Sequence, residues 1–368
     1  MQHKIILLSV WLLIQGGVFV VARPAPKRVQ VTVNPTVETI ATLMNQLSPE
    51  FLPDSATDLA GYRRSRLMRL NYDAFRPWAN HPAVAATKAL SDKIGTGVYL
   101  LGLYSRPLPD VGLEQPVSAL ILHEIHPNPD SASAIVTAYL GTLALFYREA
   151  GVARFMARHR SVYDQAVAQV RKNCPSADFV PTMETYYGSQ KAAYTLVVMP
   201  FFISGWGMGW QVGEGTQARI YNISAPYQDQ KVQQQRVYDP GYGDAEAVRT
   251  LAVHEFGHSF VNPYTMLPAT AAQINQYSSL FRAVPGQAQY TDWLTLFNEL
   301  TVRAGEIRIA RAMNRPDQSR RLREQYANWP YLDHFIAQLA YYEQHRASYP
   351  TFTTFLPELI GSLAQLRQ

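Results

Sequence analysis

Residues 244–263 read DAEAVRTLAVHEFGHSFVNP. Apolar residues recur in this stretch at helical spacing, and Asp244 at its start is a good helix N-cap. The dipeptide Asn262-Pro263 is a typical helix stop, because proline cannot donate the next helical hydrogen bond. The stretch therefore predicts a helix that runs from Asp244 to about Phe260.

Two histidines of this helix, His254 and His258, are four residues apart, so both imidazoles project from one face. At this spacing two nitrogens can reach one tetrahedral zinc ion at about 2.0–2.1 Å each. Glu255 is offset by about 100° around the axis, so it can lean over a zinc-bound water without coordinating the metal. Zinc lowers the pKa of that water towards about 7, and a neighbouring carboxylate can take its proton. The pattern predicts one Zn2+ ion, with Glu255 as the catalytic base.

Two histidines leave zinc short of a third protein ligand. Glu299, in the stretch 298–304 (NELTVRA), is the best candidate, because it shares a helix face with apolar residues. A carboxylate that faces inward needs a partner, and zinc would supply one. Glu306 is the rival ligand; it lies two turns further on, about 10 Å away, so both cannot bind one ion. A solvated face, or an ion pair with Arg303, is the alternative for Glu299.

Outside the motif helix the chain is mostly helical by pattern. Helices are expected at residues 35–47, 60–75, 82–94, 131–172, 293–313, 331–345 and 355–367. Strand-forming runs are expected at residues 29–33, 192–202 and 218–224. The glycine-rich segment 205–215 is expected to be a connector, and it does not match a phosphate-binding loop. The fold class predicted is α+β, mostly helical, with a small β-sheet preceding the motif helix.

The pattern also divides the chain into four parts. Residues 1–22 have a short basic start, an apolar run and small residues before a cleavage point, which is typical of a signal peptide. Residues 23–34 form a linker and first strand, residues 35–190 a mainly helical region, and residues 191–368 the metal-binding region. The last two are expected to form one compact unit. The leader predicts export to the periplasm or beyond, with no integral membrane segment after cleavage.

Composition and isolated motifs exclude other classes. With 47% hydrophobic and 17% charged residues the chain can bury a sizeable core. Its net charge of +5 comes from scattered basic residues, so no nucleic-acid partner is expected. The lone Cys174 excludes an internal disulfide, and the missing Gly-x-Ser-x-Gly motif disfavours a serine hydrolase. His123 and His126 have the wrong spacing and precede a proline, which favours a helix end or loop.

Residues 253–263 (VHEFGHSFVNP) followed by residues 298–304 (NELTVRA) resemble the gluzincin metallopeptidases, which bind zinc through two His and one Glu. More closely, they look like an exported bacterial family that is catalogued as a domain of unknown function and regarded as metallopeptidase-like. The resemblance implies a zincin-like fold and a peptide or protein substrate.

Carried over residue by residue, the resemblance implies His254, His258 and Glu299 as zinc ligands and Glu255 as the base. Two departures from the better-known gluzincins stand out. The interval between the second histidine and the glutamate is longer than usual. Arg303 stands where those enzymes often have an aspartate that supports a ligand histidine.

The function expected from these residues is an exported zinc-dependent hydrolase, a metallopeptidase of gluzincin type. The alternative from another class is a catalytically idle zinc-binding exported protein that acts as a binding or envelope-associated module. A third hypothesis is a metal hydrolase that acts on a non-peptide amide or ester. Glu255 argues against the idle protein, because a structural zinc site needs no base beside an open position.

Overall fold

A computed structural model describes residues 28–47, 65–174, 176–233, 236–287 and 289–367. The predicted signal peptide, residues 1–22, lies outside the described residues. The fold is α+β and mostly helical, as predicted, with a small mixed sheet ahead of the helix that carries the two histidines.

The central sheet has three parallel strands and one antiparallel strand. Its strands, in spatial order, are β1 (Gln30–Thr32), β2 (Ala193–Val198), β4 (Arg219–Ser224) and β3 (Gly207–Val212). β3 runs antiparallel to β4 and is an edge strand within the described residues. A separate hairpin is formed by β5 (Lys231–Gln233) and β6 (Arg236–Asp239). The strands predicted within 29–33, 192–202 and 218–224 are confirmed.

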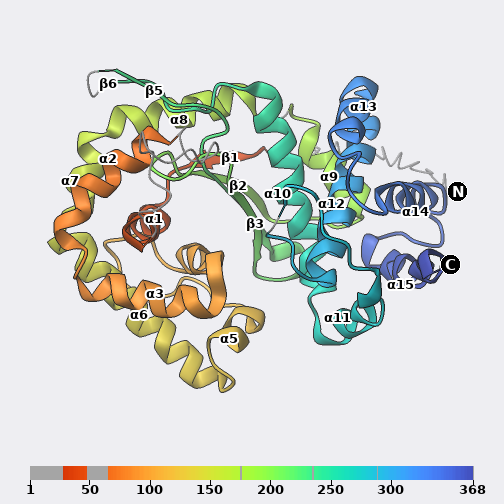
Figure 1. The fold of residues 1–368 in the computed structure, drawn as a ribbon, viewed down its shortest axis with the longest axis horizontal. Helices are drawn as coiled ribbons and strands as arrows, with labels where there is room; N and C mark the ends of the chain where they lie inside the picture. The colour runs from red at the N-terminus through yellow and green to blue at the C-terminus, as the bar shows by residue number, and fades with distance from the viewer. Residues whose placement is uncertain (1–27, 48–64, 175, 234–235, 288, 368) are drawn as a thin grey trace, which may run out of the picture.

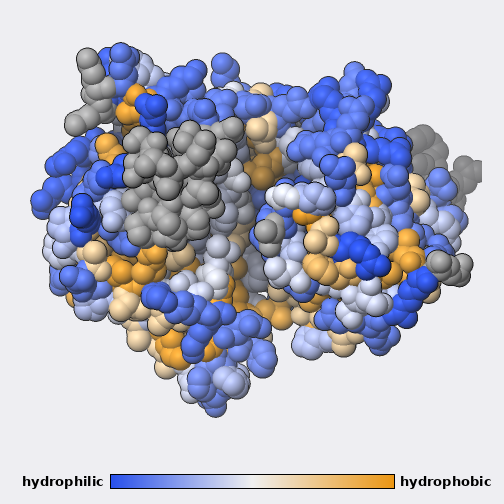
Figure 2. Space-filling model, viewed as in Figure 1, coloured by the Kyte–Doolittle hydropathy of each residue, from blue (hydrophilic) through white to orange (hydrophobic). Residues whose placement is uncertain are grey.

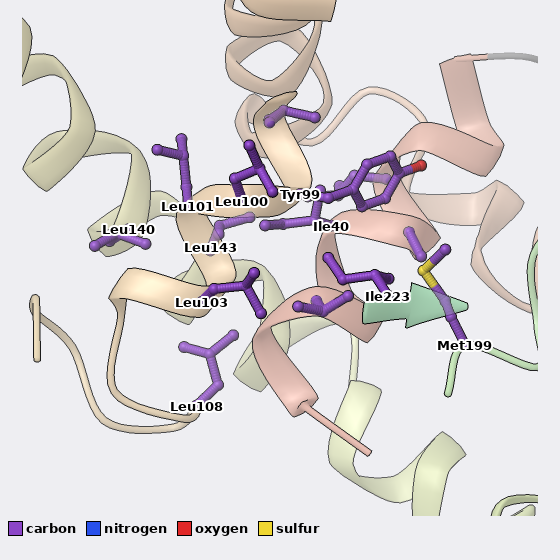
Figure 3. Packing of buried hydrophobic residues seen from close by; sticks show 14 of the residues in the cluster. Ile40, Tyr99, Leu100, Leu101, Leu103, Leu108, Leu140, Leu143, Met199 and Ile223 are labelled. Atoms are coloured by element: carbon purple, nitrogen blue, oxygen red, sulfur yellow. The ribbon is translucent and has the colours of Figure 1, made fainter. Parts of the chain in front are cut away.

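One group of helices lies on the side of the sheet that Figure 1 shows on the left. Its members are α1 (Pro35–Leu47), α2 (Arg66–Phe75), η3 (Arg76–Trp78), α3 (Pro82–Ile94), η4 (Gly95–Leu100), α4 (Leu101–Tyr104), α5 (Ala119–Ile125), α6 (Pro129–Glu149), α7 (Val152–Arg158) and α8 (Arg160–Asn173). Their apolar side chains pack together with residues from the sheet and its loops. Figure 3 shows Ile40, Tyr99 and Leu103 of this cluster close to Met199 and Ile223.

The second group lies on the opposite side of the view. It comprises α9 (Phe179–Tyr187), η5 (Gly215–Gln217), α10 (Ala245–Thr265), α11 (Pro268–Asn275), η6 (Ser278–Leu280), α12 (Trp293–Ala312), α13 (Pro316–Gln325), α14 (Leu332–Gln344), α15 (Phe352–Ser362) and η7 (Leu363–Arg367). Ile220 of β4 packs into this group, whereas Ile223 of the same strand packs into the first. Successive strand residues alternate between faces, so one sheet serves both cores. In the described ranges no helix combines the length and the apolar character needed to cross a membrane.

Two helix predictions were wrong in their boundaries. The pattern over residues 131–172 is not one helix, because Gly151 adopts a left-handed conformation with φ of 73° and separates α6 from α7. Helix α10 does not end before Pro263 but continues to Thr265. Val261 and Phe260 are buried there, and this packing outweighs the hydrogen bond that proline cannot make.

The prediction of a connector over residues 205–215 was also wrong, because Gly207–Val212 form β3. Glycine has a low intrinsic preference for β-strands, because it has no side chain to pack and loses much backbone freedom on folding. Here the missing side chains of Gly207 and Gly209 let α10 lie directly against the strand. Tertiary packing therefore overrides the local preference.

A buried acid lies in the first group of helices, away from the histidines. Glu38 of α1 is 2% exposed and accepts a hydrogen bond from the Tyr163 hydroxyl at 2.9 Å. Its other carboxyl oxygen has no hydrogen-bond partner. Burial raises the pKa of Glu38 from 4.5 to about 8, although the Tyr163 hydrogen bond opposes the shift. The carboxyl group is therefore protonated in the folded protein at neutral pH.

Glu38→Gln is expected to change how stability depends on pH. The folded protein holds the Glu38 proton more tightly than the unfolded chain, so wild-type stability falls as pH rises from about 4.5 to about 8. The variant lacks this titration and gains on the wild type by up to about 1.4 kcal/mol per pH unit in that window. Urea unfolding of both proteins at pH 5 and pH 8 measures the gain. Glu324→Gln, at an exposed position, is the control; equal pH slopes for Glu38→Gln and wild type would contradict the assignment.

Candidate metal centre

The two histidines are presented by a helix whose start is fixed locally. Asp244 is the N-cap of α10, as predicted, and its carboxylate accepts hydrogen bonds from the backbone N–H groups of Glu246 and Ala247. His254 and His258 follow in the third and fourth turns, and each is 8% exposed. Their rings are nearly perpendicular, with centroids 4.7 Å apart. The motif helix therefore holds both imidazoles in one nearly enclosed place.

Helix α12 crosses α10 and carries Glu299, the acid of the candidate centre. Gly257 of α10 lies close to Val302 of α12, since a Cβ on this glycine would be 3.1 Å from a Val302 methyl carbon. A Cβ on Gly305 of α12 would be 2.9 Å from the Tyr187 hydroxyl. Both contacts are tighter than ordinary side-chain contacts. Gly257 thus allows α12 to approach α10 closely, and this approach places Glu299 over the histidines.

Three donor groups converge at this crossing. The Nε2 atoms of His254 and His258 are 3.1 Å apart. The Glu299 carboxylate lies 3.3 Å from His258 Nε2 through Oε1 and 3.7 Å from His254 Nε2 through Oε2. Donors around a tetrahedral ion with bonds of about 2.0–2.1 Å lie roughly 3.3–3.4 Å apart. Glu299 Oε2 is buried without a hydrogen bond, and its charged neighbours are His254 and the Arg303 guanidinium. His254, His258 and Glu299 could therefore hold a metal ion.

The charges of these groups are strongly coupled. Burial lowers the pKa of His258, but the nearby Glu299 carboxylate outweighs it and raises the pKa to about 9. Burial raises the pKa of Glu299, but the two imidazoles hold it well below its usual range. In the metal-free protein His258 and Glu299 thus form an imidazolium–carboxylate pair. A metal ion that binds His258 Nε2 must displace that proton.

Glu306 supports the centre from the other side of His254. Its Oε1 lies 3.1 Å from His254 Nδ1, opposite the nitrogen that faces Glu299. On the second histidine, Asn262 Oδ1 lies 3.2 Å from His258 Nδ1. Such contacts fix the tautomer and ring orientation of a ligand histidine. The Asn262 contact is a hydrogen bond, whereas Glu306 Oε1 and His254 Nδ1 lie close together without one. Glu306 is not one of the three convergent donors, and its carboxylate lies on the far side of His254.

Arg303 holds the Glu299 carboxylate. Its guanidinium lies 3.1 Å from Glu299 Oε2 and packs over the rings of Tyr326 and Trp329, at 4.6 and 4.1 Å from their centroids. The ion pair that was the alternative role for Glu299 is thus present together with the contacts to both histidines. Arg303 does not replace the supporting aspartate of gluzincins, because that place beside the histidine is taken by Glu306.

Glu255 lies beside the three donors without joining them. It is 5% exposed, and its carboxylate points towards β3, where its Oε1 lies next to Gly207. Burial raises the pKa of Glu255, while the charges of His254 and His258 oppose the shift. A carboxyl group with a raised pKa is a better proton acceptor near neutral pH than an exposed one.

Other histidines and one buried tyrosine lie elsewhere or have other partners. His334 Nε2 is 2.9 Å from the Ser362 hydroxyl, and the Tyr342 hydroxyl donates to the Tyr186 carbonyl. His123 and His126 lie at the end of α5, as expected. The contacts of Glu306 and Asn262 with the two histidines were not predicted from sequence. For Asn262, the i, i+4 spacing from His258 could have indicated the contact.

Comparison with known proteins gives a family. A family model described as "Domain of unknown function (DUF4932)" matches residues 120–362, well over half of the chain, and the match includes all the residues of the candidate centre. No curated protein and no solved structure matches the chain. The resemblance to a family of unknown function therefore stands, and the description of that family assigns it no activity.

The centre predicts a graded response of metal affinity to substitution. Glu299→Ala and His258→Ala are expected to abolish tight binding of one Zn2+, because each removes a donor. Glu306→Gln keeps all three donors and is expected to weaken affinity about 10–100-fold, since it loses only the charge behind His254. Competition with a zinc-sensitive fluorescent chelator measures the affinities. Glu246→Gln, an exposed acid on the same helix, is the control; wild-type affinity in Glu299→Ala would refute the centre.

Proposed function

The chain belongs to the DUF4932 family, a domain of unknown function, and we propose that it is an exported zinc-dependent hydrolase that cleaves peptide bonds. One observation carries the proposal. A buried carboxylate, Glu255, lies beside three convergent metal donors and is not one of them.

The proposed roles follow from the positions of the side chains. His254, His258 and Glu299 would hold the ion, which would supply Lewis-acid activation of a water molecule and of the substrate carbonyl. Glu255 takes the proton from the attacking water and returns it to the leaving amine. Arg303 holds Glu299 in place through their ion pair, and Glu306 lies beside the His254 nitrogen that faces away from Glu299.

The number of donors favours a catalytic over a structural ion. Structural zinc sites are closed by four protein ligands, whereas catalytic sites have three and leave one position open. In the part of the chain that the structure describes, the group around His254 consists of three donors. An open position beside a buried acid is the arrangement that hydrolysis requires.

The sheet supports a peptide as the substrate. β3 packs against α10 and is an edge strand in the described chain, so an extended peptide can add to it through main-chain hydrogen bonds. Met208 and Trp210 alternate with the glycines of β3 and pack against the first core, where Trp210 Nε1 donates to the Tyr104 hydroxyl at 2.7 Å. The parts of both side chains that stay exposed flank the open edge. Figure 2 shows a hollow between the two halves of the molecule with apolar side chains in it. The leader at residues 1–22 supports export.

Glu255→Gln is expected to separate binding from catalysis. The amide retains the size of the side chain but cannot accept the proton, so zinc stays bound while peptide cleavage falls by at least about 100-fold. Digestion of a peptide library by both proteins, with and without chelator, together with metal analysis, tests this. Glu246→Gln is again the matched control. Chelator-sensitive cleavage by Glu255→Gln at the wild-type rate would contradict the mechanism.

The same digest separates the alternatives. A catalytically idle zinc-binding module would bind the ion and cleave none of the peptides. A hydrolase for non-peptide amides or esters would leave the peptides intact but cleave small amide or ester substrates in a chelator-sensitive way.

A further inference from the structure

The edge strand β3 contains two glycines that face α10, the helix that carries His254, Glu255 and His258. A Cβ on Gly207 would be 2.6 Å from Glu255 Oε1, and a Cβ on Gly209 would be 1.7 Å from the Glu255 carbonyl oxygen. Neither glycine is among those with positive φ. Their backbone conformation is therefore open to any residue, and the feature in use is the missing side chain.

The two glycines meet different parts of Glu255. Gly209 lies against its backbone, where a side chain could be accommodated only if α10 moved away from the sheet. Gly207 meets the end of the Glu255 side chain and the Leu251 Cδ2 atom, which would be 3.2 Å from the new Cβ. Ends of flexible side chains can move, so an alanine at position 207 displaces the carboxylate and leaves the fold in place.

We propose that Gly207 is a positioning residue for the catalytic base: its missing side chain leaves the space that the Glu255 carboxylate occupies. The contact itself is independent of the enzyme's activity, whereas its catalytic consequence rests on the function proposed above. Glu255 is 5% exposed, so little free space remains for a displaced carboxylate. Restoring an ordinary contact of about 3.4 Å from 2.6 Å moves the carboxylate by several tenths of an ångström.

Such a shift is large for a group that must transfer a proton. Misplacement of a reacting group by about 1 Å can cost about 100-fold in rate. Gly207→Ala is therefore expected to lower kcat about 10–100-fold while the zinc content and KM remain those of the wild type. A raised KM with unchanged kcat would overturn the proposal, because it would mean that Gly207 makes room for substrate rather than for the base.

The contact is tested without activity by a double-mutant comparison of Tm. Gly207→Ala is expected to lower the Tm of the wild type more than that of Glu255→Ala, in which the carboxylate is gone and only the contact with Leu251 remains. Gly209→Ala is the matched control. It is expected to lower Tm equally in both backgrounds, because the carbonyl oxygen that it meets remains in Glu255→Ala. Equal Tm shifts for Gly207→Ala in the two backgrounds would overturn the proposal.

A variant with a shorter acid at position 255 tests the same contact through catalytic activity. Glu255→Asp withdraws the carboxylate from Gly207, so adding Gly207→Ala is expected to lower kcat far less than it does in the wild type. Equal losses in both backgrounds would contradict the positioning role. If the wild type cleaves no peptide, the proposed function fails, and the Tm comparison still decides whether Gly207 makes room for the Glu255 carboxylate.

Discussion

The close crossing of α10 and α12 is the constraint on which the site depends. Glu299 and the two histidines come from different helices, and they can share an ion only if those helices nearly touch. Glycines at the crossing, Gly257 and Gly305, allow this, and the Tyr187 hydroxyl fills the remaining space. A side chain at position 257 would press on Val302 of α12, and one at position 305 would press on the Tyr187 hydroxyl of α9, so either would disturb the packing that holds Glu299 against the imidazoles. The glycine inside the motif therefore has a structural cause, which offsets its cost of about 1 kcal/mol in helix propensity.

Burying this many charges also constrains the molecule. Glu255, Glu299 and Glu306 are all buried within the same pair of helices, and Arg303 is the neighbouring permanent cation. Charges taken out of water are costly unless they are paired. The His258 imidazole balances part of the negative charge, because the neighbouring Glu299 carboxylate raises its pKa to about 9. A divalent ion bound there would balance the charge more fully, so metal binding would also stabilise the fold.

Much of this site could be predicted from sequence because it depends on helix geometry. The i, i+4 spacing places His254 and His258 on one face, and an acid on an apolar helix face identifies Glu299. Glu306 was predicted as a rival metal ligand, and its position beside the far nitrogen of His254 was not predicted. An imidazole has a second nitrogen on its far side, and an acid two turns along α12 reaches it. Which side of a ring a neighbouring helix approaches is a tertiary property.

The strand β3 could not be predicted from local preference for a related reason. From the sequence alone its glycines predict a turn or connector. The reason for them is visible only in the packing of α10 against the strand. The same strand would serve both reactants, since one face leaves room for the base and the open edge can pair with an extended chain. An acid buried against a strand contributes nothing to packing that an apolar residue would not supply better. The proposed hydrolysis at an ion held by His254, His258 and Glu299 would explain why the cost of burying Glu255 at this position is tolerated.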